Sequence, residues 1–285
     1  MYKLTLKNED DLTLDFNQVG GAFTITQIDG LSPAKATINT SPAALLDGEK
    51  FNSSKVNMRI INMAFAIETE AEKNRLLIYQ VVRVKHPITL YYKSDLLDVF
   101  IEGYVQSCDI SHFSRKQIAT VSIVCPAPYF KGAQEVINEL TSLISAFHFP
   151  FASTEEPELI MGYIDALTDV VIENLGAVEC GLIFELYARD AISNPKIYNY
   201  DTNEFILLNF DMQAGDLITI NTERGHKSVS LLRDGQNVNL FNCFDKDSTW
   251  LTLAPRGSVF VYEVGTGVIS NLIVTIKHYN LFEGV

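Results

Sequence analysis

Apolar and polar residues alternate at every second position over much of this chain, a pattern that predicts β-strands. In residues 22–28, for example, Phe23 and Ile25 share one face while Thr24 and Thr26 share the other. Turn-forming residues such as Asn8 to Asp11 and Asp47-Gly48 separate these segments. Further strands are expected at residues 1–6, 12–16, 34–40, 49–67, 88–92, 97–110 and 117–125.

One helix is expected within this first part, at residues 69–80. Thr69 is a suitable N-cap and acidic residues follow it, as is typical of the first turn of a helix. Glu70 with Lys73, and Glu72 with Arg75, are spaced to pair along the helix surface. The helix must end before Pro87, because the residue before a proline avoids helical geometry.

The period then changes from two to a three-and-four spacing, which predicts an amphipathic helix over residues 133–147. Its apolar stripe comprises Ala133, Val136, Ile137, Leu140, Leu143, Ile144 and Phe147. We expect this stripe to pack on one of the domains, with Leu140 buried near its middle, because an exposed stripe would promote aggregation. Residues 148–159 contain two prolines and little periodicity, which is typical of a linker.

From residue 169 the chain again reads as short alternating strands separated by glycine-rich turns, which favours a β-sandwich or jelly roll. Within this part, residues 215–235 combine acids, bases, His226 and three glycines. We interpret them as strands at 217–222 and 228–232 with turns at 223–226 and 234–235 rather than as a catalytic loop. The predicted fold class is therefore mainly β (α+β), with residues 1–132 as the first domain, 133–168 as a helical connector and linker, and 169–285 as the sandwich.

Composition and charge narrow the possible functions. The chain has 285 residues, of which 47% are hydrophobic, so a packed core is available. Its net charge of −13 argues against general nucleic-acid binding, which requires basic residues to neutralise phosphates. The sequence shows neither a secretory signal nor an apolar run of about 18 residues, so we expect no membrane segment. Its four cysteines are expected to be reduced and mostly buried.

No catalytic or metal-binding motif is found in the sequence. The five histidines do not occur in a zinc-type spacing, no two cysteines form a C-x-x-C pair, and Gly225-His226-Lys227-Ser228 departs from the phosphate-loop pattern. Cys125 ends an apolar strand, where an inert thiol is the ordinary expectation. We therefore expect no enzyme activity, no catalytic residue, no metal and no cofactor.

The order of these segments resembles the distal tail protein family of long, non-contractile-tailed bacteriophages and their prophages. The similar segments in the first half are the initial strand pair, residues 30–33, the glutamate-rich helix, and the strand with its Pro-Ala-Pro ending at 121–130. Residues 171–176, 194–198, 215–222 and 271–279 resemble the second domain of that family. The resemblance covers nearly the whole chain, and the order and spacing of the segments carry it.

The resemblance implies a structural role in the virion tail tip, after assembly in the bacterial cytoplasm. The first domain would be tail-tube-like and would form a ring, commonly a homohexamer, that joins the tail tube protein to the tail hub or tail-associated protein of the baseplate. The second domain would be a galectin-like sandwich that in some relatives docks a receptor-binding protein. The chain shows no large insertion of the kind that carries sugar-binding modules in other relatives.

An alternative function from a different class is recognition of cell-wall carbohydrate by the second domain during host adsorption. Sugar sites usually need exposed aromatic rings as flat apolar platforms. The candidate residues are Trp250, Tyr187 and Tyr198, with Tyr200 and Tyr262 as further aromatics of the same domain. Trp250 lies in an ordinary strand pattern at 249–253, so burial in the core is the competing expectation.

Overall fold

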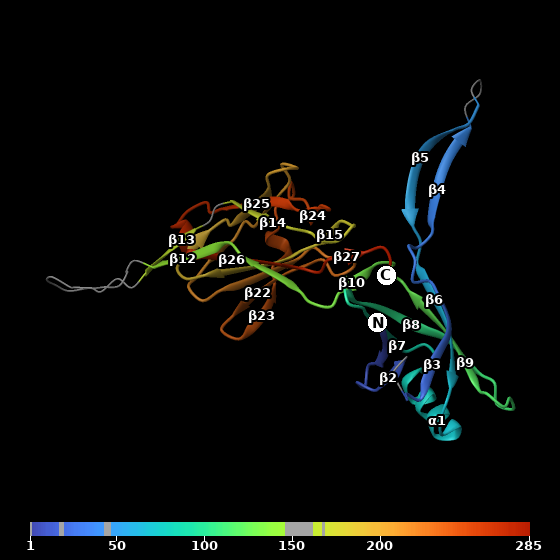
Figure 1. The fold of residues 1–285 in the computed structure, drawn as a ribbon. Helices are drawn as coiled ribbons and strands as arrows, with labels where there is room; N and C mark the ends of the chain where they lie inside the picture. Colours follow the sequence, from blue (N-terminus) through green and yellow to red (C-terminus); the bar gives the residue numbers. More distant parts are fainter. Residues whose placement is uncertain (1, 17–19, 43–46, 146–161, 167–168) are drawn as a thin grey trace. The chain divides into compact units, whose positions relative to one another are not determined.

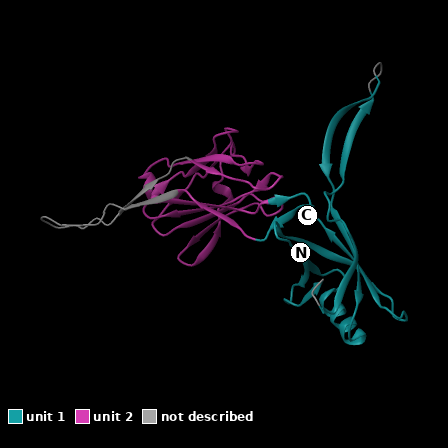
Figure 2. Ribbon diagram, in the orientation of Figure 1, with its two compact units in different colours: residues 1–133, 281–285 teal, residues 134–280 magenta. Residues whose placement is uncertain are grey.

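The computed structural model describes residues 2–16, 20–42, 47–145, 162–166 and 169–285. Two compact units divide the chain (Figure 2). The first contains residues 1–133 together with the last five residues, 281–285, and the second contains residues 134–280. The last five residues therefore belong to the first unit, although the sequence pattern placed them with the second domain.

The first unit is built on a nine-stranded sheet, which is antiparallel at every pairing (Figure 1). Seven strands follow the order β2-β1-β7-β8-β9-β6-β3, and β10 and β27 pair beside β8. Their bounds are β1 (Lys3–Asn8), β2 (Thr13–Phe16), β3 (Phe23–Asp29), β6 (Arg59–Ile67), β7 (Pro87–Lys93), β8 (Asp98–Ile110), β9 (Ile118–Cys125), β10 (Phe130–Gly132) and β27 (Leu281–Phe282). Seven of these strands match the segments expected from alternation, whereas no strand was expected at β10 or at β27.

One face of this sheet carries the core of the first unit. Alternate residues of β6 such as Ile61, Met63 and Phe65 are fully buried, and Phe65 packs edge-on against Phe16 with ring centroids 4.8 Å apart. Helix α1 (Ala71–Val81) adds Ile78 and Val81 to the same cluster. The two-residue period thus separates a buried face from an exposed one, as the alternation in the sequence requires.

Helix α1 confirms the expected helix with a different start. Its N-cap is Glu70, at φ 41°, and no side chain caps the first turn, so Thr69 does not play the expected capping role. The expected ion pair between Glu70 and Lys73 is present at 2.8 Å. No ion pair joins Glu72 to Arg75 within the part of the chain that the structure describes.

The second unit is a β-sandwich. Its larger sheet has the order β11-β26-β16-β21-β22-β23 and the smaller has β14-β25-β18-β19. Phe184 of the larger sheet and Phe260 of the smaller meet edge-to-face between them, with centroids 6.0 Å apart. The strands of the two sheets are β11 (Val136–Glu139), β14 (Asp169–Ile172), β16 (Ile183–Ala188), β18 (Lys196–Asn199), β19 (Phe205–Leu207), β21 (Leu217–Asn221), β22 (Ser228–Arg233), β23 (Gln236–Asn239), β25 (Ser258–Glu263) and β26 (Leu272–His278).

Short elements complete the second unit. Three two-stranded ladders pair β12 with β13, β15 with β24 and β17 with β20. Their bounds are β12 (Thr141–Ser145), β13 (Gly162–Ala166), β15 (Cys180–Gly181), β24 (Thr252–Leu253), β17 (Ile192–Ser193) and β20 (Asp211–Met212), and two short 3₁₀ helices, η1 (Phe241–Cys243) and η2 (Ile269–Asn271), lie between strands. The expected strand at 249–253 is thus reduced to β24, and Trp250 lies outside it.

The helix predicted for residues 133–147 is wrong. The structure forms β11 and β12 there, and β11 pairs with β26 in the register Val136 to His278 and Ile137 to Lys277. Leu140 is fully buried as expected, and its N–H donates to the carbonyl oxygen of Val274 at 2.8 Å. Ile137, by contrast, is 56% exposed. The free edge of β26 outweighs the local helical periodicity, because pairing there satisfies backbone groups of both strands. Residues 146–147 and the expected linker at 148–159 lie outside the described residues.

The stretch at 215–235 is a hairpin, as interpreted from the sequence. β21 and β22 pair from Leu217 with Leu232 to Asn221 with Ser228. Its charges are not all solvated turn charges, however. Asp216 is 1% exposed and accepts hydrogen bonds from Arg233, with Nε to Oδ1 at 2.7 Å. The Arg233 guanidinium lowers the pKa of Asp216, so the carboxylate stays ionised inside the turn.

The strand assignment at residues 136–140 makes a prediction that a helix does not share. Leu140→Ala should lower the free energy of unfolding by about 2–5 kcal/mol, because it deletes a fully buried side chain. Ile137→Ala should cost no more than about 1 kcal/mol, since an exposed strand residue contributes mainly β-propensity. Denaturant unfolding of both variants measures this difference. Equal, large losses at 137 and 140 would contradict the strand, because both positions belong to the apolar stripe that a helix would bury.

Candidate assembly surface

The most exposed element of the first unit is a two-stranded hairpin of β4 (Ala36–Pro42) and β5 (Glu49–Val56), which we call the arm. It forms a sheet of its own, separate from the nine-stranded sheet (Figure 1). All residues of β5 except Val56 are exposed. Ile38 and Phe51 expose 63% and 59% of their surface. The arm therefore presents both of its faces, including large apolar side chains, to solvent.

The backbone pairing of β4 with β5, together with hydrogen bonds between polar side chains, holds the arm together without a core. Asn39 Nδ2 donates to Ser53 Oγ at 2.9 Å, Thr37 pairs with Asn57, and Thr40 donates to Glu49. The backbone register shifts between Asn39 and Thr40. An isolated two-stranded hairpin is marginally stable in water at best, since it buries little apolar surface. The arm thus has the composition of a segment that a partner covers.

Arg59 fixes the base of the arm. It is 2% exposed and lies three residues after the end of β5. Its Nη1 donates to the carbonyl oxygens of Gly30 and Ser32 at 2.5 and 2.6 Å, just before the arm begins. Its Nε donates to the carbonyl oxygen of Pro128 at 2.7 Å, and Nη2 donates to that of Glu283. One guanidinium therefore ties both ends of the arm to the segment before β10 and to the C-terminal residues.

The surroundings of Arg59 fit a buried cation without a carboxylate partner. Its guanidinium lies over the ring of Phe130, 4.6 Å from the centroid, which adds a cation–π contact. Burial lowers the pKa of Arg59, but a guanidinium keeps its charge in proteins. Gly30 is required beside it: its φ is +94°, and a Cβ there would lie 2.2 Å from the carbonyl oxygen of Ile60. The Gly30 turn noted in the sequence thus has a steric reason.

The sequence-predicted aromatic residues do not form one site. Tyr187 is 40% exposed on β16 of the larger sheet, while Tyr198 is half-buried on β18 of the smaller sheet. Both alternate with buried neighbours, so they face outward from opposite sheets of the sandwich. Tyr200 is 64% exposed, and Tyr262 is fully buried, which removes Tyr262 as a sugar platform.

Trp250 is half-buried and neither a core residue nor a free platform. Its ring stacks on Phe244, with centroids 4.8 Å apart, and lies 6.1 Å from the ring of Phe241. Lys227 Nζ lies 5.2 Å from the centre of the Trp250 ring. Phe241, which the sequence pattern did not single out, is the most exposed ring of the group, at 52%. The sequence does not indicate that Phe241 of 3₁₀ helix η1, or Phe244 directly after it, lies against Trp250, because η1 has no sequence periodicity.

Three of the four cysteines and one histidine lie in surroundings that favour their neutral forms. Burial raises the pKa of Cys108 and of Cys125 to about 11 and that of Cys180 to about 12, so these thiols stay protonated at neutral pH. Burial also lowers the pKa of His278, which favours its neutral form. Among the described residues, no group of three or more His, Cys, Asp or Glu side chains is arranged to hold a metal ion. The described helices include none long and apolar enough to span a bilayer.

Comparison with known proteins identifies the fold. Residues 175–278 match the family model of the siphovirus-type tail component, C-terminal domain (SPP1 Dit). The whole chain is similar to the crystal structure of SPP1 Dit, described as a paradigm of the hub adsorption apparatus in phages that infect Gram-positive bacteria, with a TM-score of 0.68, 12% identity, and coverage of 98% of this chain and 99% of that one. No curated protein sequence matches the chain significantly.

Two further structures show the same likeness. A chain of the phage P2 baseplate, in its activated conformation with calcium, gives a TM-score of 0.57 at 14% identity, and each chain is covered completely. The corresponding structure with strontium gives 0.52 at 12% identity, with 98% of each chain covered. The mainly β fold of this chain is therefore that of siphophage tail and baseplate components over nearly its full length.

The Arg59 network predicts a stability effect. Arg59→Met keeps an unbranched side chain of similar size but removes the cation over Phe130 and leaves four carbonyl groups without their donor. It should lower the free energy of unfolding of the first unit by more than about 3 kcal/mol, because four hydrogen bonds to a charged group are lost and each contributes about 1.5–3 kcal/mol. Arg115→Met, at an exposed arginine of the same unit, is the control and should change it by about 0.5 kcal/mol or less. Thermal and denaturant melts measure this loss. If Arg59→Met and the control have the same free energy of unfolding, the network contributes little to stability.

Proposed function

We propose that this chain is a distal tail protein, a structural subunit of a siphophage tail tip that connects the tail tube to the hub and baseplate. The fold of SPP1 Dit extends over both units, and the family match lies in the second unit. The described residues offer no metal-binding cluster, and burial keeps the thiols of Cys108, Cys125 and Cys180 protonated. A scaffold role fits these properties, and it places the chain in the virion.

The arm is the observation that carries the proposal. Its two strands pair only with each other among the described elements, and its faces expose Ile38 and Phe51. A subunit that works alone gains nothing from an exposed apolar hairpin, which is an aggregation liability. A subunit of a ring covers such a surface with its neighbour. We therefore propose that the first unit forms the ring, with the arm as one of its contacts.

The stoichiometry and the partners form part of the same proposal. Closed rings of identical subunits require an interface that repeats head to tail. The resemblance favours a homohexamer that contacts the tail tube protein on one side and the tail hub protein on the other. The net charge of −13 opposes closure, because like-charged subunits repel each other at low salt. Added salt or a bound partner should therefore favour the ring.

The second unit has a smaller part in this proposal. It fits a docking module for a receptor-binding protein, as the resemblance implies. Carbohydrate binding remains the alternative function, and the outward positions of Tyr187 and Tyr198 on opposite sheets weigh against a single aromatic platform. The remaining exposed aromatic surfaces for a sugar are the ring of Tyr200 and the ring of Phe241 beside Trp250.

A shortened arm tests the proposal. Residues 37–55 are replaced by an Asn-Gly turn that joins the paired residues Ala36 and Val56. The variant should melt like the parent, because the arm contributes little to the core, but it should fail to form the ring-sized species that the parent forms. Sedimentation velocity over a concentration series, with and without the tail tube and hub proteins of the same phage, measures this. A parent that stays monomeric in every mixture would contradict the proposed function, and rings of the shortened variant would remove the arm from the interface.

A further inference from the structure

The loop that joins β8 to β9, residues 111–117, is held in one shape by its own hydrogen bonds, and we call it the finger. Ser111 Oγ accepts from the N–H of Ile118 at 2.9 Å and lies 2.9 Å from Ser114 Oγ. Ser114 Oγ donates to the carbonyl oxygen of Lys116 at 2.8 Å, and Gln117 Nε2 donates to that of His112. These bonds organise the loop before any partner binds, which reduces the entropy lost on binding.

The finger exposes an aromatic and a basic side chain, and the ring contact recorded for the aromatic one is with its neighbour His112, at a centroid distance of 6.3 Å. Phe113 is fully exposed, at 105% of its reference surface. Arg115 is also exposed, and it forms no ion pair or side-chain hydrogen bond within the described residues. Lys116 instead pairs with Glu68 at 3.0 Å. An exposed Phe beside an arginine is unusual for a free surface, but such residues commonly anchor protein interfaces.

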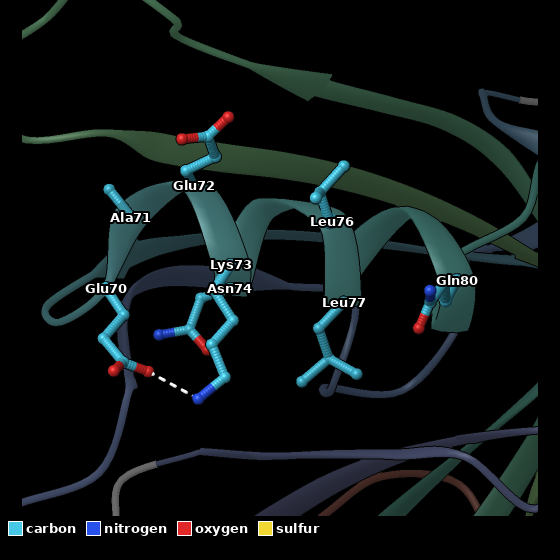
Figure 3. A pocket seen from close by; sticks show the side chains of 8 residues that line it. All are labelled: Glu70, Ala71, Glu72, Lys73, Asn74, Leu76, Leu77 and Gln80. Atoms are coloured by element: carbon cyan, nitrogen blue, oxygen red, sulfur yellow. Dashed lines mark hydrogen bonds and ion pairs between the residues drawn. The ribbon is translucent and has the colours of Figure 1, made fainter.

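A surface with complementary properties lies on α1 of the same unit. A hollow there is lined by the apolar side chains of Ala71, Leu76 and Leu77 (Figure 3). Its charged side chains are Glu70, Lys73 and Glu72, and Lys73 pairs with Glu70, so Glu72 is the acid that stays unpaired in the described part of the chain. Glu72 and Leu76 project to the same side of the helix (Figure 3). Leu76 is 54% exposed, and Glu72 has no ion pair among the described residues. The hollow thus offers an apolar contact beside an acidic side chain.

The spacing of the two surfaces agrees. Glu72 and Leu76 are four residues apart on a helix, which places their Cβ atoms about 5–6 Å from each other. Phe113 and Arg115 are two residues apart, a separation that spans at most about 7 Å along a chain. Phe113 can therefore contact Leu76 while Arg115 pairs with Glu72. One relative placement of the two surfaces therefore satisfies both the charge pair and the apolar contact.

Within one chain these surfaces do not cover each other. The finger approaches its own helix only near the C-terminal end, where Tyr79 Oη lies 3.4 Å from His112 Nε2. Phe113 remains fully exposed there, and Leu76 remains more than half exposed. Two complementary surfaces that stay uncovered in the single chain are therefore available to other copies.

We propose that the finger of one copy binds the α1 hollow of a second copy of this chain, with Phe113 on Leu76 and Arg115 paired with Glu72. The contact joins two different surfaces, so it repeats head to tail and closes into a ring when the rotation permits. The inference rests on the proposed ring and names a contact within it. The finger contact is separate from the arm, and the two can be tested independently.

Charge reversal on each side tests this contact. Arg115→Glu gives a chain whose finger and helix are both acidic, and Glu72→Arg gives a chain in which both are basic. Each variant alone should self-associate at least about tenfold more weakly than the parent, because every contact then joins like charges. An equimolar mixture should recover association near the parental level, since both surfaces of each variant match those of the other. Sedimentation velocity at fixed ionic strength measures all three samples.

Lys93→Glu is the matched control, because it reverses the charge of an exposed, ion-paired lysine of the same unit that lies outside both the finger and the α1 hollow. It should associate like the parent. The finger contact would be overturned if either variant associates like the parent, or if the mixture associates no more strongly than each variant alone. Rings formed by the parent would still support the proposed function in that case. A parent that never associates, even with tube and hub proteins, would overturn both. A folded state of each variant is confirmed by its thermal melt.

Discussion

The buried guanidinium of Arg59 is the constraint on which the first unit depends. It donates to four main-chain carbonyl oxygens, from Gly30, Ser32, Pro128 and Glu283. These groups come from the two ends of the arm, the segment before β10 and the C-terminus. A buried guanidinium must find acceptors, and its N–H groups form a rigid fork that can serve all four carbonyl oxygens. The first unit is consequently complete only when residues 281–285 have returned to it and β27 has paired with β10.

The same framework leaves specific surfaces without an intramolecular partner. The arm is fixed at its base but exposed along its length, and the finger holds Phe113 in solvent through a set of local hydrogen bonds. Conformational order without burial costs entropy that a monomer does not recover. In the ring that we propose, the burial of Phe51, Phe113 and Leu76 would offset that cost. The order of these elements in the free chain is one of the observations that favour the proposed assembly.

The sequence predicted the parts of the fold that local periodicity controls. Alternation located the strands around Phe65 and around Ile218, because one face of each is buried and a period of two follows directly. Periodicity gave the wrong element at residues 133–147. The spacing of Val136 and Leu140 fits a helix as well as a strand, and pairing with the free edge of β26 makes the segment a strand. A four-residue separation is compatible with both periods when the segment is short.

The candidate surfaces were less predictable, for physical reasons that particular residues show. Arg59 carries no motif, and its four partners lie up to 224 positions away along the chain. Phe241 and Phe244 meet Trp250 only through the 3₁₀ helix η1, so the tryptophan alone gave a misleading platform. The exposure of Phe113 depends on hydrogen bonds within its loop. Such features arise from tertiary contacts, whereas the overall resemblance rests on the order of strands and was accessible from the sequence.

Hydrogen exchange of the arm tests the central claim most directly, namely that the exposed surfaces of the first unit are covered on assembly. In the free chain the amides of β4 and β5 should exchange rapidly, since a hairpin without a core opens at little free-energy cost. In the assembled state, separated by size and measured by mass spectrometry, the same amides should exchange at least about tenfold more slowly, corresponding to about 1.4 kcal/mol of added protection. Unchanged exchange in β4 and β5, together with new protection elsewhere in the first unit, would contradict the account.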